Sequence, residues 1–170
     1  MDNKIAVFLD GANFFFMQKE ALKWFADPKK LLTFIEKEYG SIEDAFYYIG
    51  HDAPPEAKQK AFLDSLPKMG YSVVSKPIKS IFNPKTGTKK KKANLDIEIV
   101  IDMFNTIDRY DTAVLISGDS DFERALEQLK SRGKKVIVIA TDKFIAKELV
   151  NFAGRNYIRL DDIRAEIERI

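Results

Sequence analysis

The sequence contains no cysteine and only one histidine, His51. The absence of cysteine excludes disulfide bonds and thiolate metal sites, and it fits a reducing compartment. A lone histidine in a predicted loop offers no Ser-His-Asp or Cys-His set for nucleophilic catalysis, and neither a P-loop nor a GxGxxG motif is present. Carboxylates are therefore the side chains to examine for chemistry.

Long apolar runs are also missing. No stretch approaches the ~20 apolar residues needed to cross a bilayer, and the first residues lack the pattern of a secretory signal. With 45% hydrophobic residues and 13 phenylalanines, the 170 residues suffice to bury one core. We therefore expect a single domain over residues 1–170 that is soluble and cytoplasmic, with no membrane partner.

Acidic residues are absent between Asp64 and Asp96, although the whole chain has a net charge of only +2. The same segment contains eight lysines, including the run at residues 89–92. Such a one-sign block creates a local positive field that a polyanion would feel. A solvated loop that keeps the protein soluble explains the lysines by themselves equally well.

Short apolar runs alternate with amphipathic segments along the whole chain. We predict strands at residues 5–9, 45–49, 71–77, 112–116, 136–139 and 157–160. Helices are predicted between them, among others at residues 14–25, 28–39, 95–107, 122–131 and 143–152. Residues 78–92 lose this periodicity and should form an exposed loop or ribbon. The alternation predicts an α/β fold, a mostly parallel sheet of five to six strands with helices on both faces.

Four aspartates lie where predicted strands and helices meet. Asp10 ends the first strand, Asp119 and Asp121 follow the fourth strand, and Asp96 lies in the first turn of a helix that we expect Asn94 to cap. Open α/β sheets bind ligands at the carboxyl ends of their strands, near a topological switch point. If the first and fourth strands are neighbours there, the carboxylates converge on one place. Mg²⁺ and Mn²⁺ prefer such hard oxygen ligands.

Each aspartate also has a structural explanation. Asp10 with Gly11 is a common turn pair, and the other three are suitable residues for helix N-termini. Together, however, unpaired acids at strand ends would raise one another's pKa unless a cation were present. We therefore favour a metal site whose ligands and catalytic residues are Asp10, Asp96, Asp119 and Asp121.

Other polar side chains near these acids are candidates for substrate binding. Asn13 either orients a water or phosphate or caps the following helix. Ser117 and Ser120 offer hydroxyl groups to a phosphate or to a metal-bound water. Asp102 faces another side of its helix than Asp96, so we expect at most an indirect role for it. The remaining candidates are four lysines that would contact a phosphate backbone, and their contribution to the binding affinity should fall as the salt concentration rises. They are Lys89, Lys90, Lys91 and Lys92.

Aromatic residues also lie near the acids in the sequence. Phe122 and three consecutive phenylalanines at residues 14–16 could stack on nucleobases. Three consecutive side chains of a helix cannot all face one groove, so we expect the aromatic residues to belong to the core.

Three segments together resemble the NYN domain, and more narrowly the LabA-like branch of the PIN-like nucleases. They are residues 8–14 (FLDGANF), residues 92–103 and residues 116–122 (ISGDSDF), and they follow the expected order along nearly the whole chain. The chain departs from the family at one place. Members often carry Lys-Gly-Val-Asp, and this chain has Lys-Ala-Asn-Leu-Asp, which leaves Asp96 in place.

The resemblance implies a Rossmann-like, PIN-like domain with an acidic pocket for Mg²⁺ or Mn²⁺ that acts on RNA, with single-stranded RNA as the expected partner. The matching acids are Asp10, Asp96, Asp119 and Asp121, with Asn13 as a polar helper. Our leading hypothesis is a metal-dependent endoribonuclease. The alternative is a non-catalytic regulatory module of the same fold that binds RNA or a protein. A homodimer would build a longer basic groove, but nothing in the residue pattern requires one.

Overall fold

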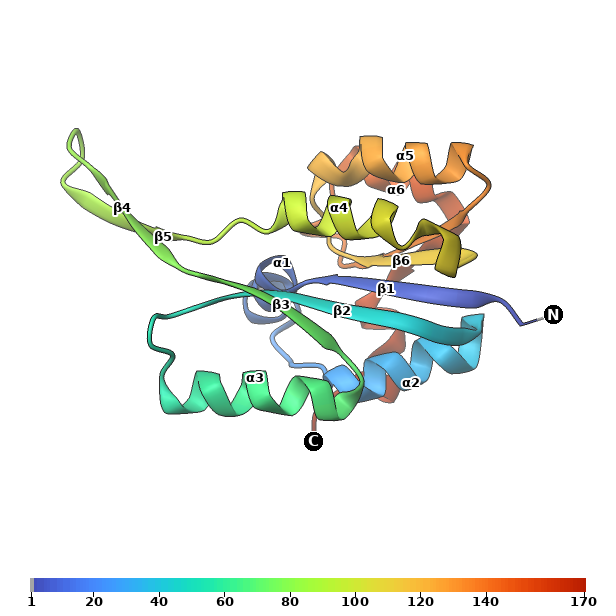
Figure 1. Ribbon diagram of the computed structural model, residues 1–170, viewed down its shortest axis with the longest axis horizontal. Helices are drawn as coiled ribbons and strands as arrows, with labels where there is room; N and C mark the ends of the chain where they lie inside the picture. The colour runs from blue at the N-terminus through green and yellow to red at the C-terminus, as the bar shows by residue number, and fades with distance from the viewer. Residues whose placement is uncertain (1) are drawn as a thin grey trace.

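The fold is built on a six-stranded parallel sheet (Figure 1). The computed structural model describes residues 2–170, except the side chains of residues 90–92. The strand order is β3-β2-β1-β6-β7-β8. The bounds are β1 Lys4–Asp10, β2 Ser41–His51, β3 Ser72–Pro77, β6 Thr112–Ile116, β7 Lys135–Ala140 and β8 Tyr157–Arg159. The predicted parallel α/β architecture is confirmed.

The central strands are almost entirely apolar because both faces of the sheet are covered, as is usual for parallel sheets. All five residues of β6 are buried, and so are all residues of β1 after Lys4. Side chains alternate between the two faces. Ile5, Val7 and Leu9 enter one core cluster, whereas Ala6 and Phe8 enter the other. Asp10 continues the second set and therefore points to the face that carries the candidate acids.

Helices cover the two faces in separate groups (Figure 1). One face packs against α2 (Pro28–Tyr39), α3 (Ala57–Met69) and the short α7 (Arg164–Ile167). The other face packs against α4 (Asp96–Asn105), α5 (Glu123–Ser131) and α6 (Lys147–Ala153). The short α1 (Gly11–Phe16) and the π-helix η1 (Met17–Leu22) follow β1 directly. Four 3-10 turns complete the chain: η2 Ile107–Arg109, η3 Ser120–Phe122, η4 Gly154–Asn156 and η5 Leu160–Ile163.

The lysine-rich segment forms an antiparallel hairpin of β4 (Lys79–Asn83) and β5 (Thr88–Lys92). Of the two predicted forms, loop or ribbon, the ribbon is therefore correct. Only Ile78 separates β3 from β4, and the hairpin extends beyond the carboxyl edge of the main sheet (Figure 1).

Two helix predictions were wrong in their extent. The helix expected at residues 14–25 begins already at Gly11, because Asp10 caps it, and it ends before Lys23, whose φ of 62° is left-handed. The helix expected at residues 143–152 begins only at Lys147. Its predicted first turn is a tight turn instead, because the N–H groups of Phe144 and Ile145 both donate to the carbonyl of Thr141.

Candidate metal centre

The candidate acids gather at the topological switch point of the sheet. β1 and β6 are neighbours in the middle of the strand order, and the chain leaves them toward opposite halves of the sheet. Leu9 pairs with Ile116 in the register of these two strands. Asp10 and Ser117, the next residues, therefore lie side by side at the carboxyl edge, where doubly wound sheets bind ligands.

Asp10 is held at this edge by two hydrogen bonds. One carboxylate oxygen accepts the N–H of Asn13 at 3.3 Å and so caps α1. The other accepts the hydroxyl of Ser117 at 3.0 Å. Gly11 lets α1 start this close to the sheet, since a Cβ there would collide with the carbonyl oxygen of Tyr48.

The loop after β6 is tied to the loop after β1. The side-chain oxygen of Asn13 accepts the N–H of Gly118 at 3.0 Å, and the hydroxyl of Ser117 accepts the N–H of Asp119 at 3.2 Å. Asp119 in turn caps η3 by accepting the N–H of Asp121 at 2.9 Å. These hydrogen bonds fix the backbone positions of Asp119 and Asp121 in the loop after β6.

Asp96 comes from the opposite side, on the first turn of α4. The helix begins at Asp96 rather than at Leu95, and the side-chain oxygen of Asn94 accepts the N–H of Asp96 at 2.8 Å. Lys76, near the end of β3, forms an ion pair with Glu98 and anchors the same turn. The expectation that Asn94 is the N-cap was wrong, because the N-cap is Leu95 and makes no side-chain cap hydrogen bond. Asn94 lies one residue before it and holds the start of the helix through its bond to Asp96.

Three of the four predicted acids form one cluster. Asp96, Asp119 and Asp121 each offer a carboxylate oxygen, and these oxygens lie within 4.8 Å of one another. A set of three carboxylates suits a hard divalent cation such as Mg²⁺ or Mn²⁺. Asp10 is not part of this closest group. It lines the same cleft of about 240 Å³ as Asp96 and Asp119, and Ser117 links it to Asp119.

The electrostatics of the cleft favour a bound cation. Burial raises the pKa of Asp10 above its usual value, the hydrogen bonds from Asn13 and Ser117 lower it, and the charge of Asp119 raises it again. A cation would offset both the lost hydration and the repulsion between neighbouring carboxylates. The residues present therefore fit a divalent metal.

The predicted substrate-binding residues differ in their burial and in their position relative to the cleft. Ser117 is completely buried and its hydroxyl serves Asp10 and Asp119, whereas Ser120 is exposed beside the acids. Lys89 is exposed on β5 and is not one of the residues that line the cleft. The predictions for the side chains of Lys90, Lys91 and Lys92 fall outside the described part of the chain.

Sequence reasoning missed Tyr48, which lines the cleft. Its hydroxyl donates to a carboxylate oxygen of Asp102 at 2.9 Å, and burial, followed by the charge of Asp102, raises the pKa of Tyr48. Asp102 thus acts away from the cluster, as expected. The signal for Tyr48 was its position in the second strand, where it pairs with Asp10, but only the register of the sheet makes that pairing visible.

Comparison with known proteins decides the family. The profile of the NYN domain matches residues 4–161. The chain belongs to the NYN domain family. It is also 43% identical over 169 residues to the low amplitude and bright protein LabA of Synechococcus elongatus, an alignment that covers 98% of this chain and 89% of that protein. This similarity places the NYN domain described here in the LabA-like branch.

A solved structure supports the same fold for the NYN domain. A protein of unknown function from Vibrio parahaemolyticus superposes with a TM-score of 0.79 and 25% sequence identity, over 99% of this chain and 97% of that chain. Within the described residues, none of the helices has the length and hydrophobicity that a membrane crossing requires.

Proposed function

We propose that this NYN-domain protein is a Mg²⁺- or Mn²⁺-dependent endoribonuclease that hydrolyses phosphodiester bonds in RNA. The observation that carries the proposal is the cluster of Asp96, Asp119 and Asp121 at the switch point, with oxygens within 4.8 Å of one another. Family membership supplies the expectation of a nuclease-type fold that acts on RNA. The cluster supplies the chemical means.

The chain's own carboxylates would hold the metal. Asp96 belongs to α4, whereas Asp119 is the N-cap of η3 and Asp121 lies within η3, so the ligands come from two separate elements. We assign Asp10 as the fourth acid. Its two hydrogen bonds leave capacity on its oxygens, because a carboxylate has about four acceptor positions. When bound, the cation would activate a water and stabilise the leaving 3′ oxygen.

The neighbouring polar groups would position these acids and the RNA. Ser117 and Asn13 hold the loops after β6 and β1 together, so the carboxylates stay in place before substrate arrives. Ser120 is exposed next to the acids, where its hydroxyl could donate to a phosphate oxygen. The hairpin of β4 and β5 would attract the phosphate backbone of the RNA.

A cleavage assay on labelled single-stranded RNA tests the proposal. The wild-type protein with Mg²⁺ or Mn²⁺ should cleave the RNA, and EDTA should abolish cleavage. Asp96→Asn should lower the rate by at least about 100-fold, because it removes one ligand of the proposed cation. Asp108→Asn is the matched control, since Asp108 is exposed in η2, beyond the carboxyl end of α4.

The outcomes of this assay distinguish the ribonuclease from the non-catalytic binding module. Cleavage that survives Asp96→Asn would overturn the site assignment. RNA binding without cleavage, in both metals, would overturn the enzyme and favour the non-catalytic binding module of the same fold.

A further inference from the structure

A second and larger cavity, of about 670 Å³, opens next to the acidic cleft. It lies between α1, the carboxyl end of β2 and α3. Ala12, Phe16 and Ala93 line both the cavity and the cleft, so the two are contiguous along one edge of the sheet. The volume is within the ~300–1,000 Å³ typical of sites for small molecules. We call this cavity the aromatic pocket.

Three phenylalanines expose their rings at the aromatic pocket. Phe15, Phe16 and Phe25 are 49%, 53% and 42% exposed. The ring centroid of Phe15 lies 6.1 Å from that of Phe16 and 6.2 Å from that of Phe25. Phe14, their neighbour in the sequence, is buried in the core. The expectation that all three consecutive phenylalanines belong to the core was therefore wrong for two of them. Contiguous exposed aromatic surface is typical of a binding site.

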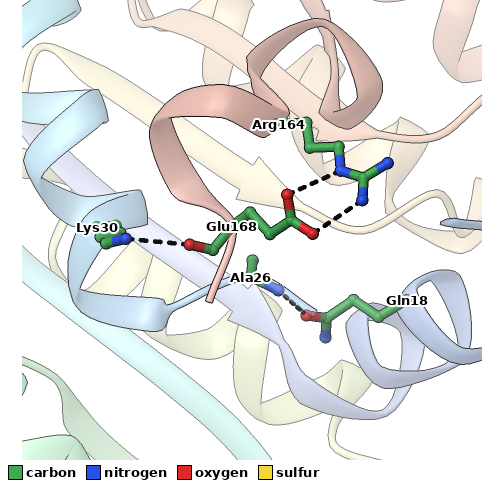
Figure 2. A network of polar contacts seen from close by, with 5 residues as sticks. All are labelled: Gln18, Ala26, Lys30, Arg164 and Glu168. Atoms are coloured by element: carbon green, nitrogen blue, oxygen red, sulfur yellow. Dashed lines mark hydrogen bonds and ion pairs between the residues drawn. The ribbon is translucent and has the colours of Figure 1, made fainter. Parts of the chain in front are cut away.

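The wall that carries Phe25 is preorganised. The buried side chain of Gln18 accepts the N–H of Ala26 at 2.7 Å (Figure 2). The same side chain donates to the carbonyl of Phe14 at 3.1 Å. The N–H of Arg169 donates to the carbonyl of Phe25 at 2.8 Å. Glu168, the residue before Arg169, is also held in place, as Figure 2 shows. Its carboxylate accepts hydrogen bonds from Arg164, and its carbonyl accepts one from Lys30. A ligand would therefore meet a wall that needs little ordering.

Positive charge accompanies the aromatic rings. Arg169 lines the pocket, and the ammonium of Lys19 lies 5.9 Å from the ring centroid of Phe15. Ile78 and Ala93, which flank the basic hairpin on its two sides, also line the pocket. A flat aromatic ligand attached to negative phosphates matches this combination of stacking surface and cations better than a neutral apolar molecule does.

We propose that the aromatic pocket binds an unpaired nucleobase of the RNA strand whose phosphodiester lies in the acidic cleft. The strand would cross from the cleft to the pocket over Phe16, which lines both. The substrate must then be single-stranded beside the cleaved bond, because a paired base cannot enter. This inference rests on the proposed ribonuclease function, but its binding part can be measured without catalysis.

The test is a double-mutant cycle between protein and RNA, measured as binding in EDTA so that no cleavage occurs. An abasic nucleotide is moved stepwise along a short single-stranded RNA. For wild-type protein, one abasic position should weaken binding about 10-fold, as expected for a stacked base. In Phe25→Ala, which lines the pocket and not the cleft, binding should be weaker for the intact RNA and the abasic effect should disappear.

Phe144→Ala is the matched control, because Phe144 is 38% exposed and lines neither cavity. It should keep the full abasic effect. The proposal would be overturned if the abasic nucleotide weakened binding equally at all positions, or if its effect were unchanged in Phe25→Ala. It would also be overturned if the protein bound a duplex of the same sequence as tightly as the single strand.

A parallel cleavage assay in Mg²⁺ separates the two proposals. Cleavage without coupling to Phe25 would leave the ribonuclease in place and overturn the base pocket. Coupling without cleavage would support the base pocket and overturn the ribonuclease.

Discussion

Asp10 is the only acid among the buried polar residues of the described chain. Its position follows directly from the alternation of β1, which sends it to the face of α4, while its two hydrogen bonds serve the loops around it. The same carboxylate therefore has a structural and a proposed functional role. Burying an ionised carboxylate is unfavourable unless a charge or hydrogen bonds compensate it, which explains why burial dominates its raised pKa.

This raised pKa predicts a pH-dependent effect of Asp10→Asn on stability. A group whose pKa is higher in the folded than in the unfolded state destabilises the fold once it ionises. In EDTA, Asp10→Asn and wild type should therefore have similar free energies of unfolding below about pH 4, and the variant should be the more stable one at pH 7. Denaturant titrations at the two pH values measure the difference.

Asp108→Asn serves as the control for this measurement, because Asp108 is exposed, and its effect should not follow this pattern. A difference between Asp10→Asn and wild type that is the same at both pH values would contradict the assignment of a destabilising buried charge.

At the scale of elements, the site depends on three chain segments that meet only at the switch point. The tip of β1, the turn η3 after β6 and the first turn of α4 each contribute acids. The capping bonds of Asp10 and Asp119 could be anticipated, because aspartate at a strand-to-helix junction is a favoured N-cap. The bond from Gly118 to Asn13 could not, since it joins residues 105 positions apart.

The hairpin of β4 and β5 carries the prediction at the scale of elements. Replacing the lysines at residues 89–92 by alanine should weaken RNA binding and flatten its salt dependence. For single-stranded nucleic acid, each phosphate contact contributes about 0.7 to the slope of log K against log salt. Loss of all four contacts should therefore reduce the slope by up to about 2.8, which binding titrations at several salt concentrations measure.

The control for the hairpin removes Lys29 and Lys37, which are exposed on α2. In this control variant, the slope of log K against log salt should stay close to that of the wild-type protein. An equal reduction per lysine in the control would show that net charge, and not the hairpin, attracts the RNA.

For the whole molecule, the three clustered carboxylates predict that a divalent cation stabilises the folded state. A ligand that binds only the folded state at about 100 times its Kd adds about 2.7 kcal/mol to the free energy of unfolding. For a chain of this length, that corresponds to a rise in Tm of roughly 5–10 °C. Thermal unfolding with Mg²⁺ or Mn²⁺, compared with EDTA, measures the shift.

The variant that combines Asp96→Asn, Asp119→Asn and Asp121→Asn should lose this shift, and Asp108→Asn should keep it. An equal shift in the triple variant would place the cation elsewhere in the molecule.

The sequence by itself determined the class of fold and singled out four aspartates, three of which the structure brings together. Apolar runs such as residues 112–116 are buried strands because no other element of that length and composition fits, and the aspartates that follow them must lie at their carboxyl ends. Family-like segments at residues 8–14 and 116–122 pointed to the same acids. These are local properties, set by side-chain periodicity and capping chemistry within a few residues.

Only the tertiary structure decided which residues share a surface. That β1 lies beside β6, that Tyr48 pairs with Asp10, and that Phe15 and Phe16 are exposed while Phe14 is buried all depend on strand order and helix placement. The physical reason is that contacts between distant segments arise from the packing of whole faces. Sequence periodicity identifies a face as apolar or polar, but it does not say which other face meets it.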